Sequence, residues 1–320
     1  MDTIKVDRSF VSADALAEVV DEAYAFGVAD CRLFSKMLRT QDNDHYLVRT
    51  ENGRKYVARV YQEGSHLERR ESDYQFELDW LLFLHEQGQS VSYPIARKDG
   101  GYLGHINAPE GKRYYVLFSF ADGDDMSLDN EDHLYQMGAA MARIHKISNT
   151  YQPRYERHEM NLEFLLDKPL ERIQEFWGND PDRTDDLDLI LAAAAESRSE
   201  LEGLLANEVS ADDSWGPIGG DFHHNSTRFD AEGQMAFFNF DLCGYGWRAY
   251  DIAAFLLNTQ LMHRSTDLTE AFFAGYYSER QLNENEHAAI SPFLTVRRVW
   301  LTGVFAVQHG LAGHTFIAAA

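Results

Sequence analysis

The sequence predicts an α+β protein, with a small sheet-containing part followed by a larger, mainly helical part. Three observations support this prediction. The turn Asn52-Gly53 lies between two short apolar runs, which is typical of a β-hairpin. Beyond residue 125, apolar residues recur mostly with helical spacing. The 320 residues are 44% hydrophobic, so the chain can fill one large core or two modest ones.

The first part is predicted to form a helix, a hairpin, a second helix and a second hairpin. Apolar residues near the start of the chain have helical spacing, and Gly27 can end that helix. Gly88 can end the second helix in the same way. The predicted elements are a helix at 12–26, strands at 45–48 and 55–61, a helix at 67–87, and strands at 102–106 and 114–120.

The second part follows a polar connection at 121–125, which we interpret as an inter-domain hinge. We therefore expect one domain at 1–120 and another at 121–320. Helical patterns dominate the second domain, and no internal repeat is present. The predicted helices are 133–146, 161–177, 186–206, 250–262, 269–277 and 286–307, and the predicted strands are 227–229 and 235–241.

The formal charge of −23 argues against two classes of partner. Nucleic acids and anionic membrane surfaces both require clustered Lys and Arg. A cationic substrate fits better, although an acidic surface also serves solubility. Cys31 and Cys243 are the two cysteines, so we expect a reducing, cytoplasmic setting. Residues 1–10 form no apolar signal core, and no run approaches the ~20 apolar residues of a membrane span.

Arg59 and Glu77 are charged residues in apolar surroundings. Arg59 shares a strand face with Val57 and Tyr61, and Glu77 falls on or beside the apolar stripe of its helix. Alternatively, Arg59 points to water from an edge strand and Glu77 lies at the border of the stripe. Together the two residues indicate a strand cation held by a helix acid, as in enzymes that bind nucleotide phosphates.

The segment Gly219-Gly220-Asp221-Phe222-His223 is a candidate catalytic loop. Asp221 could orient a substrate hydroxyl and accept its proton, or it could be a turn residue that bonds its own backbone. A metal site made of Asp221, His223 and His224 is disfavoured, because side chains so close in sequence rarely converge on one ion. We interpret His223 as a hydrogen-bonding support for the loop.

Asn239 and Asp241 lie at the end of a predicted strand. Strand alternation would direct both side chains to one face, where they could hold a metal. Asp251 follows at a helix start, and we interpret it as structural because a carboxylate suits the free N–H groups there.

The segment 244–249 matches the dinucleotide fingerprint GxGxxA, but its context argues against a Rossmann site. It is followed by more helix and not by a second parallel strand. The pair Gly111-Lys112 lacks the earlier Gly and the following Ser or Thr of a P-loop. Neither nucleotide-binding motif is therefore predicted.

Together these segments resemble the aminoglycoside phosphotransferase and choline kinase-like family, a relative of the protein kinases. The resemblance extends from about residue 28 to about residue 307. Residues 137–145 are similar to the family pattern LGxxLAxLH, residues 220–223 to its loop HGDxHxxN, and residues 239–253 to its DFD…DLA segment. Each motif is weak alone, but they occur in family order at suitable spacing.

The resemblance implies a bilobal protein-kinase-like fold that uses ATP and Mg²⁺. It implies Asp221 as the catalytic base, with His223 beside it. A substrate pocket is expected in the helical domain, lined by parts of 161–177 and 269–298. The other implied roles are nucleotide binding by Asn43, Arg59, Glu77, Ser119 and Phe120, and metal binding by Ser226, Asn239 and Asp241.

Three positions depart from the family pattern. Gly219 replaces the usual His, Ser226 replaces the magnesium-binding Asn, and Asn239 replaces the magnesium-binding Asp. The last change removes a full negative charge, although Ser and Asn still offer oxygen atoms and Asp241 could restore a carboxylate. The retained Asp221 favours an active site, whereas the altered metal positions favour loss of catalysis.

Three functions follow from the sequence. The first is an ATP-dependent phosphotransferase that acts on a hydroxyl of a small molecule or modified peptide. The second is a catalytically impaired, pseudokinase-like subunit that binds a ligand or a partner enzyme in a biosynthetic or resistance pathway. The third is a repurposed enzyme of another reaction class, because a fold does not fix a function.

Overall fold

The computed structural model describes residues 9–33, 43–62, 69–178, 180–205, 213–262 and 267–307. The chain divides into two compact units. The first contains Met1–Leu82 and Ser92–Ala121, and the second contains Phe83–Val91 and Asp122–Ala320. Within the described ranges, no helix combines the length and the apolar character that crossing a membrane requires.

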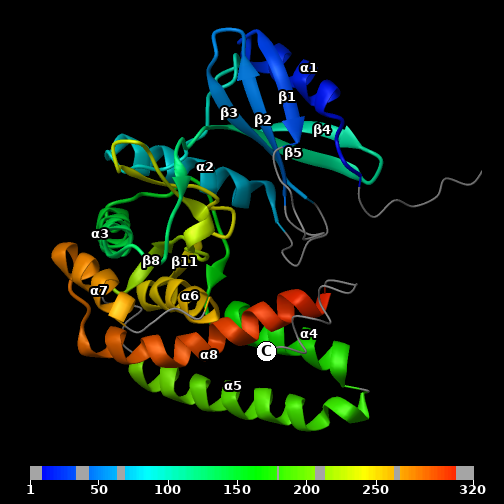
Figure 1. Ribbon diagram of the computed structural model, residues 1–320. Coiled ribbons are helices and arrows are strands. Elements are labelled where there is room, and N and C mark those ends of the chain that lie inside the picture. The colour runs from blue at the N-terminus through cyan, green and yellow to red at the C-terminus, as the bar shows by residue number, and fades with distance from the viewer. Residues whose placement is uncertain are drawn as a thin grey trace, which may run out of the picture. The chain divides into compact units, whose positions relative to one another are not determined.

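The first unit contains a five-stranded antiparallel sheet in the order β1-β2-β3-β5-β4 (Figure 1). The predicted Asn52-Gly53 hairpin joins β2 to β3, and Gly53 has the positive φ of 81° that this turn requires. Strand β1 was not predicted, because its mostly exposed residues do not alternate in polarity. The strands are β1 (Val28–Leu33), β2 (Asp44–Thr50), β3 (Lys55–Val60), β4 (Gly104–Ala108) and β5 (Gly111–Ser119).

Helix α1 (Ala13–Tyr24) precedes β1 in the sequence, and helix α2 (Glu71–Glu86) lies between β3 and β4. The buried stripe of α1 includes Leu16 and Val20, which pack with Val48 of the sheet in one hydrophobic cluster. This confirms the amphipathic pattern read from the sequence. The division between the two units falls inside α2, after Leu82.

The second unit is mainly helical, and α8 lies against α4, α5 and α6 (Figure 1). Helices α3 and α7 pack closely through glycine: a Cβ on Gly138 would lie 2.0 Å from the carbonyl oxygen of Phe272. The helices are α3 (Glu131–Ser148), α4 (Lys168–Trp177), α5 (Thr184–Leu205), α6 (Arg248–Leu261), α7 (Asp267–Glu279) and α8 (Glu284–Val307).

The second unit also contains two small three-stranded sheets. One has the order β10-β9-β6 and the other β7-β11-β8. Their strands are β6 (Asp124–Asp125), β7 (Glu159–Met160), β8 (Trp215–Ile218), β9 (Thr227–Phe229), β10 (Met235–Phe237) and β11 (Gly244–Trp247). Residues predicted as a loose connection therefore include a strand, and the predicted helix at 161–177 begins as a π-helical turn, Glu163–Asp167.

The GxGxxA segment forms β11 and the start of α6. Among the residues that the structure describes, β11 pairs in parallel with the two-residue β7 and antiparallel with β8, and no βαβ unit surrounds it. A Cβ on Gly244 would lie 2.9 Å from the carbonyl oxygen of His158. Close packing therefore explains a glycine here, and the rejection of a Rossmann site is confirmed.

Candidate active site

The first unit contains a buried ion pair between Arg59 on β3 and Glu77 on α2. Arg59 Nη1 donates to Glu77 Oε1 at 2.5 Å, and Arg59 Nε donates to Nε2 of His45 on β2 at 3.2 Å. The Arg59 and Glu77 side chains are only 5% and 1% exposed. The predicted pairing is confirmed, and the alternative of an arginine that points to water is wrong.

Aromatic side chains support this ion pair. The hydroxyl of Tyr61 donates to Glu77 Oε2 at 2.9 Å, and the Arg59 guanidinium carbon lies 4.7 Å from the ring centre of Phe118. Burial, followed by the nearby Glu77 charge, raises the pKa of Tyr61 well above its usual value. Tyr61 therefore stays protonated and keeps donating to Glu77, which fixes the carboxylate that holds Arg59.

The other predicted nucleotide-binding residues also belong to the first unit. Asn43 is buried, and its Oδ1 accepts the backbone N–H of Gln62 at 3.1 Å. The backbone N–H of Ser119 donates to the carbonyl of Tyr93 at 2.9 Å. That donor is therefore already used within the unit. Phe120 follows and is half-buried.

In the second unit, Asp251 of α6 holds the beginning of the candidate catalytic loop. Its Oδ2 accepts the N–H of Gly219 at 2.9 Å, and its Oδ1 accepts the N–H of Gly220 at 2.7 Å. Gly220 has a φ of +76°, and a Cβ there would lie 2.8 Å from the carbonyl oxygen of Leu242. The structural interpretation of Asp251 is confirmed, but the N–H groups that it binds belong to the loop.

Burial raises the pKa of Asp251 to about 7, although the two glycine N–H groups partly oppose this shift. His145 of α3 is also fully buried, and burial lowers its pKa well below the usual value, so the ring is neutral. Arg280 donates to the Tyr276 hydroxyl, whose proton is then free for His145 Nδ1 at 2.9 Å. His145 Nε2 lies 3.1 Å from Asp251 Oδ2, so the histidine links Tyr276 to Asp251.

Asp221 forms an ion pair with Arg297 of α8. Arg297 Nη2 donates to Asp221 Oδ1, while Nη1 donates to the carbonyl of Gly220 at 3.4 Å and to the Tyr250 hydroxyl at 3.3 Å. The arginine side chain is 6% exposed, and that of Asp221 is 22% exposed. Burial tends to lower the pKa of Arg297, but Tyr250 and Asp221 more than reverse this effect, so the pKa is raised. The guanidinium is therefore permanently charged.

His223 and Ser226 lie beside Asp221. Nε2 of His223 is 3.7 Å from Asp221 Oδ2 and 2.9 Å from the Ser226 hydroxyl oxygen. The predicted supporting role of His223 in the loop agrees with these contacts. Ser226 is buried, and its backbone carbonyl accepts the N–H of Phe238, the residue before Asn239, at 3.0 Å.

Asn239 does not continue the strand that precedes it. Strand β10 ends at Phe237, and Asn239 has a φ of +67°, in the left-handed region where Asn is tolerated. The prediction that Asn239 and Asp241 share one strand face is therefore wrong. Arg157 instead fixes the backbone here, because its guanidinium donates to the carbonyls of Asp241 at 2.7 Å and Cys243 at 2.5 Å.

The three residues expected to bind metal have donor atoms that suit one kind of divalent cation. Within the described parts of the chain, no group of three or more His, Cys, Asp or Glu side chains could hold a metal. Ser226, Asn239 and Asp241 offer a hydroxyl, an amide and a carboxylate, all hard oxygen donors. Magnesium commonly uses one or two carboxylates and takes its remaining ligands from phosphate and water. The donor set therefore suits an ion that arrives with a phosphate group.

The replacement of histidine by Gly219 has a packing explanation. A Cβ at this position would lie 2.6 Å from the ring of Phe222. That ring also contacts the rings of Phe237 and Phe240, at centroid distances of 4.8 and 5.7 Å. Phe222 thus occupies the space into which a longer side chain at 219 would have to extend.

Sequence reasoning missed Arg297, although a signal was present. Arg297 lies four residues after Phe293 and three before Trp300, so it falls on the apolar stripe of α8. The same argument had identified Glu77. Arg157 carried no such signal, because it precedes a two-residue strand and its partners are backbone carbonyls 84 and 86 residues away.

These features define a class of protein. Kinases combine a strand cation paired with a helix acid and an aspartate on a catalytic loop. This chain has such an ion pair in Arg59–Glu77 and a loop aspartate in Asp221. Residues 37–292 match the model of the phosphotransferase enzyme family. The chain belongs to this family of small-molecule phosphotransferases, and it has the family's kinase-like fold.

Comparisons with individual proteins give one relative by sequence and two solved structures of the same fold. An uncharacterized protein of Synechocystis sp. is 32% identical over 91% of this chain and 77% of its own length. An amicoumacin kinase solved in complex with AMP-PNP, Ca²⁺ and Ami has a TM-score of 0.77 at 21% identity, over 97% of this chain and 92% of that chain. A microcompartment-associated aminopropanol kinase has a TM-score of 0.76 at 20% identity, over 96% and 93%.

Proposed function

We propose that this protein transfers the terminal phosphoryl group of ATP to a hydroxyl of a small, amine-bearing molecule. Asp221 is the catalytic base: it orients the acceptor hydroxyl and takes its proton. The observation that carries this proposal is the Asp221 carboxylate itself, on a loop whose preceding N–H groups are held by Asp251. His223 lies beside the carboxylate, with its Nε2 3.7 Å from Asp221 Oδ2.

In this proposal, the domain at 1–120 supplies the nucleotide contacts. Arg59, fixed by Glu77, contacts the phosphates, and Asn43 stabilises the start of β2 next to them. The adenine ring bonds to the backbone near Ser119 and Phe120.

A divalent cation, Mg²⁺ in the cell, would be held by Asn239 and Asp241, with Ser226 as the weaker third position. When bound, it would neutralise charge on the transferred phosphate. The neighbouring amicoumacin kinase was solved in complex with Ca²⁺ and AMP-PNP, which supports a divalent ion and a nucleotide as cofactors of this protein. The protein residues here contribute a single carboxylate, so we expect metal binding to depend on the nucleotide.

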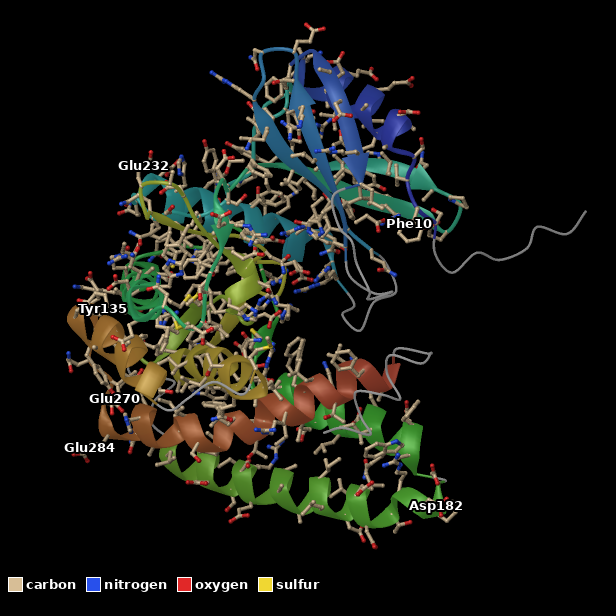
Figure 2. The ribbon with its side chains drawn as sticks, in the orientation of Figure 1. Phe10, Tyr135, Asp182, Glu232, Glu270 and Glu284 are labelled. Atoms are coloured by element: carbon tan, nitrogen blue, oxygen red, sulfur yellow. The ribbon has the colours of Figure 1, made fainter. Side chains whose placement is uncertain are left out.

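The acceptor class rests on charge. The net charge is −23, and a negative field raises the local concentration of cations. Exposed acidic side chains of the second unit include Asp182, Glu232, Glu270 and Glu284 (Figure 2). The aminopropanol kinase among the solved neighbours acts, by its name, on an amino alcohol. We assign the protein to the cytoplasm, which agrees with the absence of a disulfide between Cys31 and Cys243 in the described part of the chain.

The test is acceptor-dependent formation of ADP from ATP and Mg²⁺. Aminopropanol is compared with propanediol, which replaces the amine by a neutral hydroxyl. We expect turnover with amine-bearing acceptors and at least tenfold lower kcat/KM with propanediol. Asp221→Asn provides the background rate. ADP formation that is equal in wild type and Asp221→Asn across a panel of amino alcohols would contradict the proposal.

Asn239 and Ser226 favour one alternative, a kinase-like subunit that binds nucleotide or a partner enzyme without catalysis. In that case ATP should bind, as measured by calorimetry, and no acceptor should be phosphorylated. Restoring the family residues with Asn239→Asp and Ser226→Asn should then strengthen metal-dependent nucleotide binding without affecting the partner interaction.

A further inference from the structure

We propose that Arg297 of α8 is a positioning residue, which fixes the rotamer of Asp221 and commits its Oδ1, so that Oδ2 faces the acceptor. This inference rests on the proposed function, in which Asp221 is the base. Arg297 comes from a helix that starts at Glu284, 13 positions before it, and it lies 76 residues from Asp221 in the chain.

The first argument is the direction of the contacts. Arg297 binds two acceptor groups of the loop. It donates to the Oδ1 of Asp221 and to the carbonyl oxygen of Gly220. Asp251 binds the same loop through its N–H groups at Gly219 and Gly220. Two side chains from α6 and α8 therefore bind complementary groups of one short loop, which restricts its rotation more than either could alone.

The second argument is geometric. A planar guanidinium presents donors in a fixed fork. Nη1 of Arg297 is held by Gly220 and the Tyr250 hydroxyl, so the direction of Nη2 toward Asp221 is set. The ring of Trp300, 4.5 Å from the guanidinium carbon, covers one face. The carboxylate oxygen that remains, Oδ2, has the 3.7 Å approach to His223.

The third argument is the charge balance of the site. Among the ion pairs of the described residues, Arg297 has Asp221 as its carboxylate partner. A buried guanidinium keeps its proton and requires an anion close by. The pair thus ties Asp221 to α8 whether or not a metal or nucleotide is present, which suits a loop whose metal positions carry little charge of their own.

The experiment combines unfolding and kinetics on the full chain. Asp221→Asn, Arg297→Gln and the double variant form a thermodynamic cycle in urea, with Arg298→Gln as the matched control. Arg298 is exposed on the same helix and contacts Gln260. We expect coupling between Asp221 and Arg297 of at least tenfold in the unfolding equilibrium constant, about 1.4 kcal/mol. In the control cycle, the effects of Arg298→Gln and Asp221→Asn on the unfolding equilibrium should be additive. If Arg297→Gln does not fold, Arg297→Lys replaces it in the cycle.

The kinetic arm separates positioning from a purely structural role. We expect Arg297→Gln to lower kcat about 100-fold while KM for ATP and acceptor changes less than about threefold, and Arg297→Lys to recover part of kcat. Unchanged kcat in the folded variant, a change confined to KM, or an additive cycle would each overturn the inference. Absence of turnover in the wild type would refute the proposed function instead, while the cycle would still decide whether Arg297 holds Asp221.

Discussion

The beginning and the end of the segment from Gly219 to Asp241 are held in different ways. At the beginning, charged side chains of two helices bind both backbone and side-chain groups of the loop. At the end, Arg157 fixes backbone carbonyls, and the expected metal donors include one carboxylate, Asp241. In the proposed function, the protein thus fixes the position of the base, whereas binding of the metal depends on charge that a nucleotide brings.

This difference separates two properties that a kinase site usually combines. Orientation of the acceptor hydroxyl requires a fixed carboxylate, which the anchored loop provides. Neutralisation of phosphate charge requires cations, and each 1.4 kcal/mol lost there lowers the rate about tenfold. An enzyme with the first property and a weakened second one should be slow and strongly dependent on metal concentration. The predictions below separate the two.

The largest effect is expected from Asp221→Asn. The amide cannot accept the proton of the acceptor, so kcat should fall by about 10²- to 10⁴-fold. Asp188→Asn, at an exposed position of α5, is the control with the same charge change and should leave kcat unaltered. Steady-state ADP formation measures both. A decrease smaller than tenfold in the correctly folded variant would remove Asp221 from the role of base.

Asp251→Asn should lower the free energy of unfolding. Asn offers one acceptor oxygen for two glycine N–H groups, and one buried donor left without a partner costs about 1–3 kcal/mol. The free energy of unfolding in urea measures this loss. The control is Asn258→Asp, a reverse change at a half-buried position of the same helix that contacts His224. A variant as stable as wild type at every pH would show that Asp251 does not hold the loop.

The raised pKa of Asp251 also predicts that the free energy of unfolding depends on pH. The pKa of Asp251 is raised from 3.8 to about 7 in the folded protein, so the folded state binds a proton more tightly than the unfolded state. The stability from this group is therefore complete below pH 4 and is lost as pH rises to 7, by at most about 1.4 kcal/mol per pH unit. Asn lacks this slope. The stability difference between wild type and Asp251→Asn should thus narrow from pH 5.5 to 7.5.

Local patterns predicted those parts of the site that depend on nearby residues. The Asn52-Gly53 turn, the helix stripes and the charged residues Arg59 and Glu77 are all readable within a few residues. Burial of a charged residue on an apolar stripe was the useful signal. The same signal is present at Arg297, which lies on the apolar stripe of α8.

The remaining features arise from tertiary packing. Strands β6 and β7 have two residues each, too few for any alternation to be visible. The left-handed conformation of Asn239 was not recognised, so the strand was extended past Phe237. The bonds from Asp251 to Gly219 and from Arg157 to Asp241 join residues 32 and 84 positions apart, and no spacing rule connects such partners.

Asn239→Asp tests the metal half of the comparison. Restoring the carboxylate should raise the affinity for ATP about tenfold in the presence of Mg²⁺, because the ion gains a second protein charge. Without Mg²⁺ the added charge should repel the phosphates, so the affinity should stay equal or fall. Asn107→Asp, exposed on β4, is the control for net charge. Equal affinities of wild type and Asn239→Asp in calorimetry with Mg²⁺ would show that this position does not reach the ion.

The smallest effect is expected from Ser226→Ala. The Ser226 hydroxyl bonds to His223 at 2.9 Å, so its removal should cost about 0.5–1.5 kcal/mol of unfolding free energy. Because that hydroxyl is already engaged, the affinity for Mg²⁺ and ATP should change less than about threefold. Ser278→Ala is the control for loss of a hydroxyl at an exposed position, where Ser278 bonds to the carbonyl of Gly275 in α7; it should change stability less than Ser226→Ala and leave binding unaltered. A tenfold loss of Mg²⁺-dependent affinity in Ser226→Ala alone would place this hydroxyl on the metal, and the contrast between the anchored and the metal-binding ends of the loop would then be smaller than the contacts indicate.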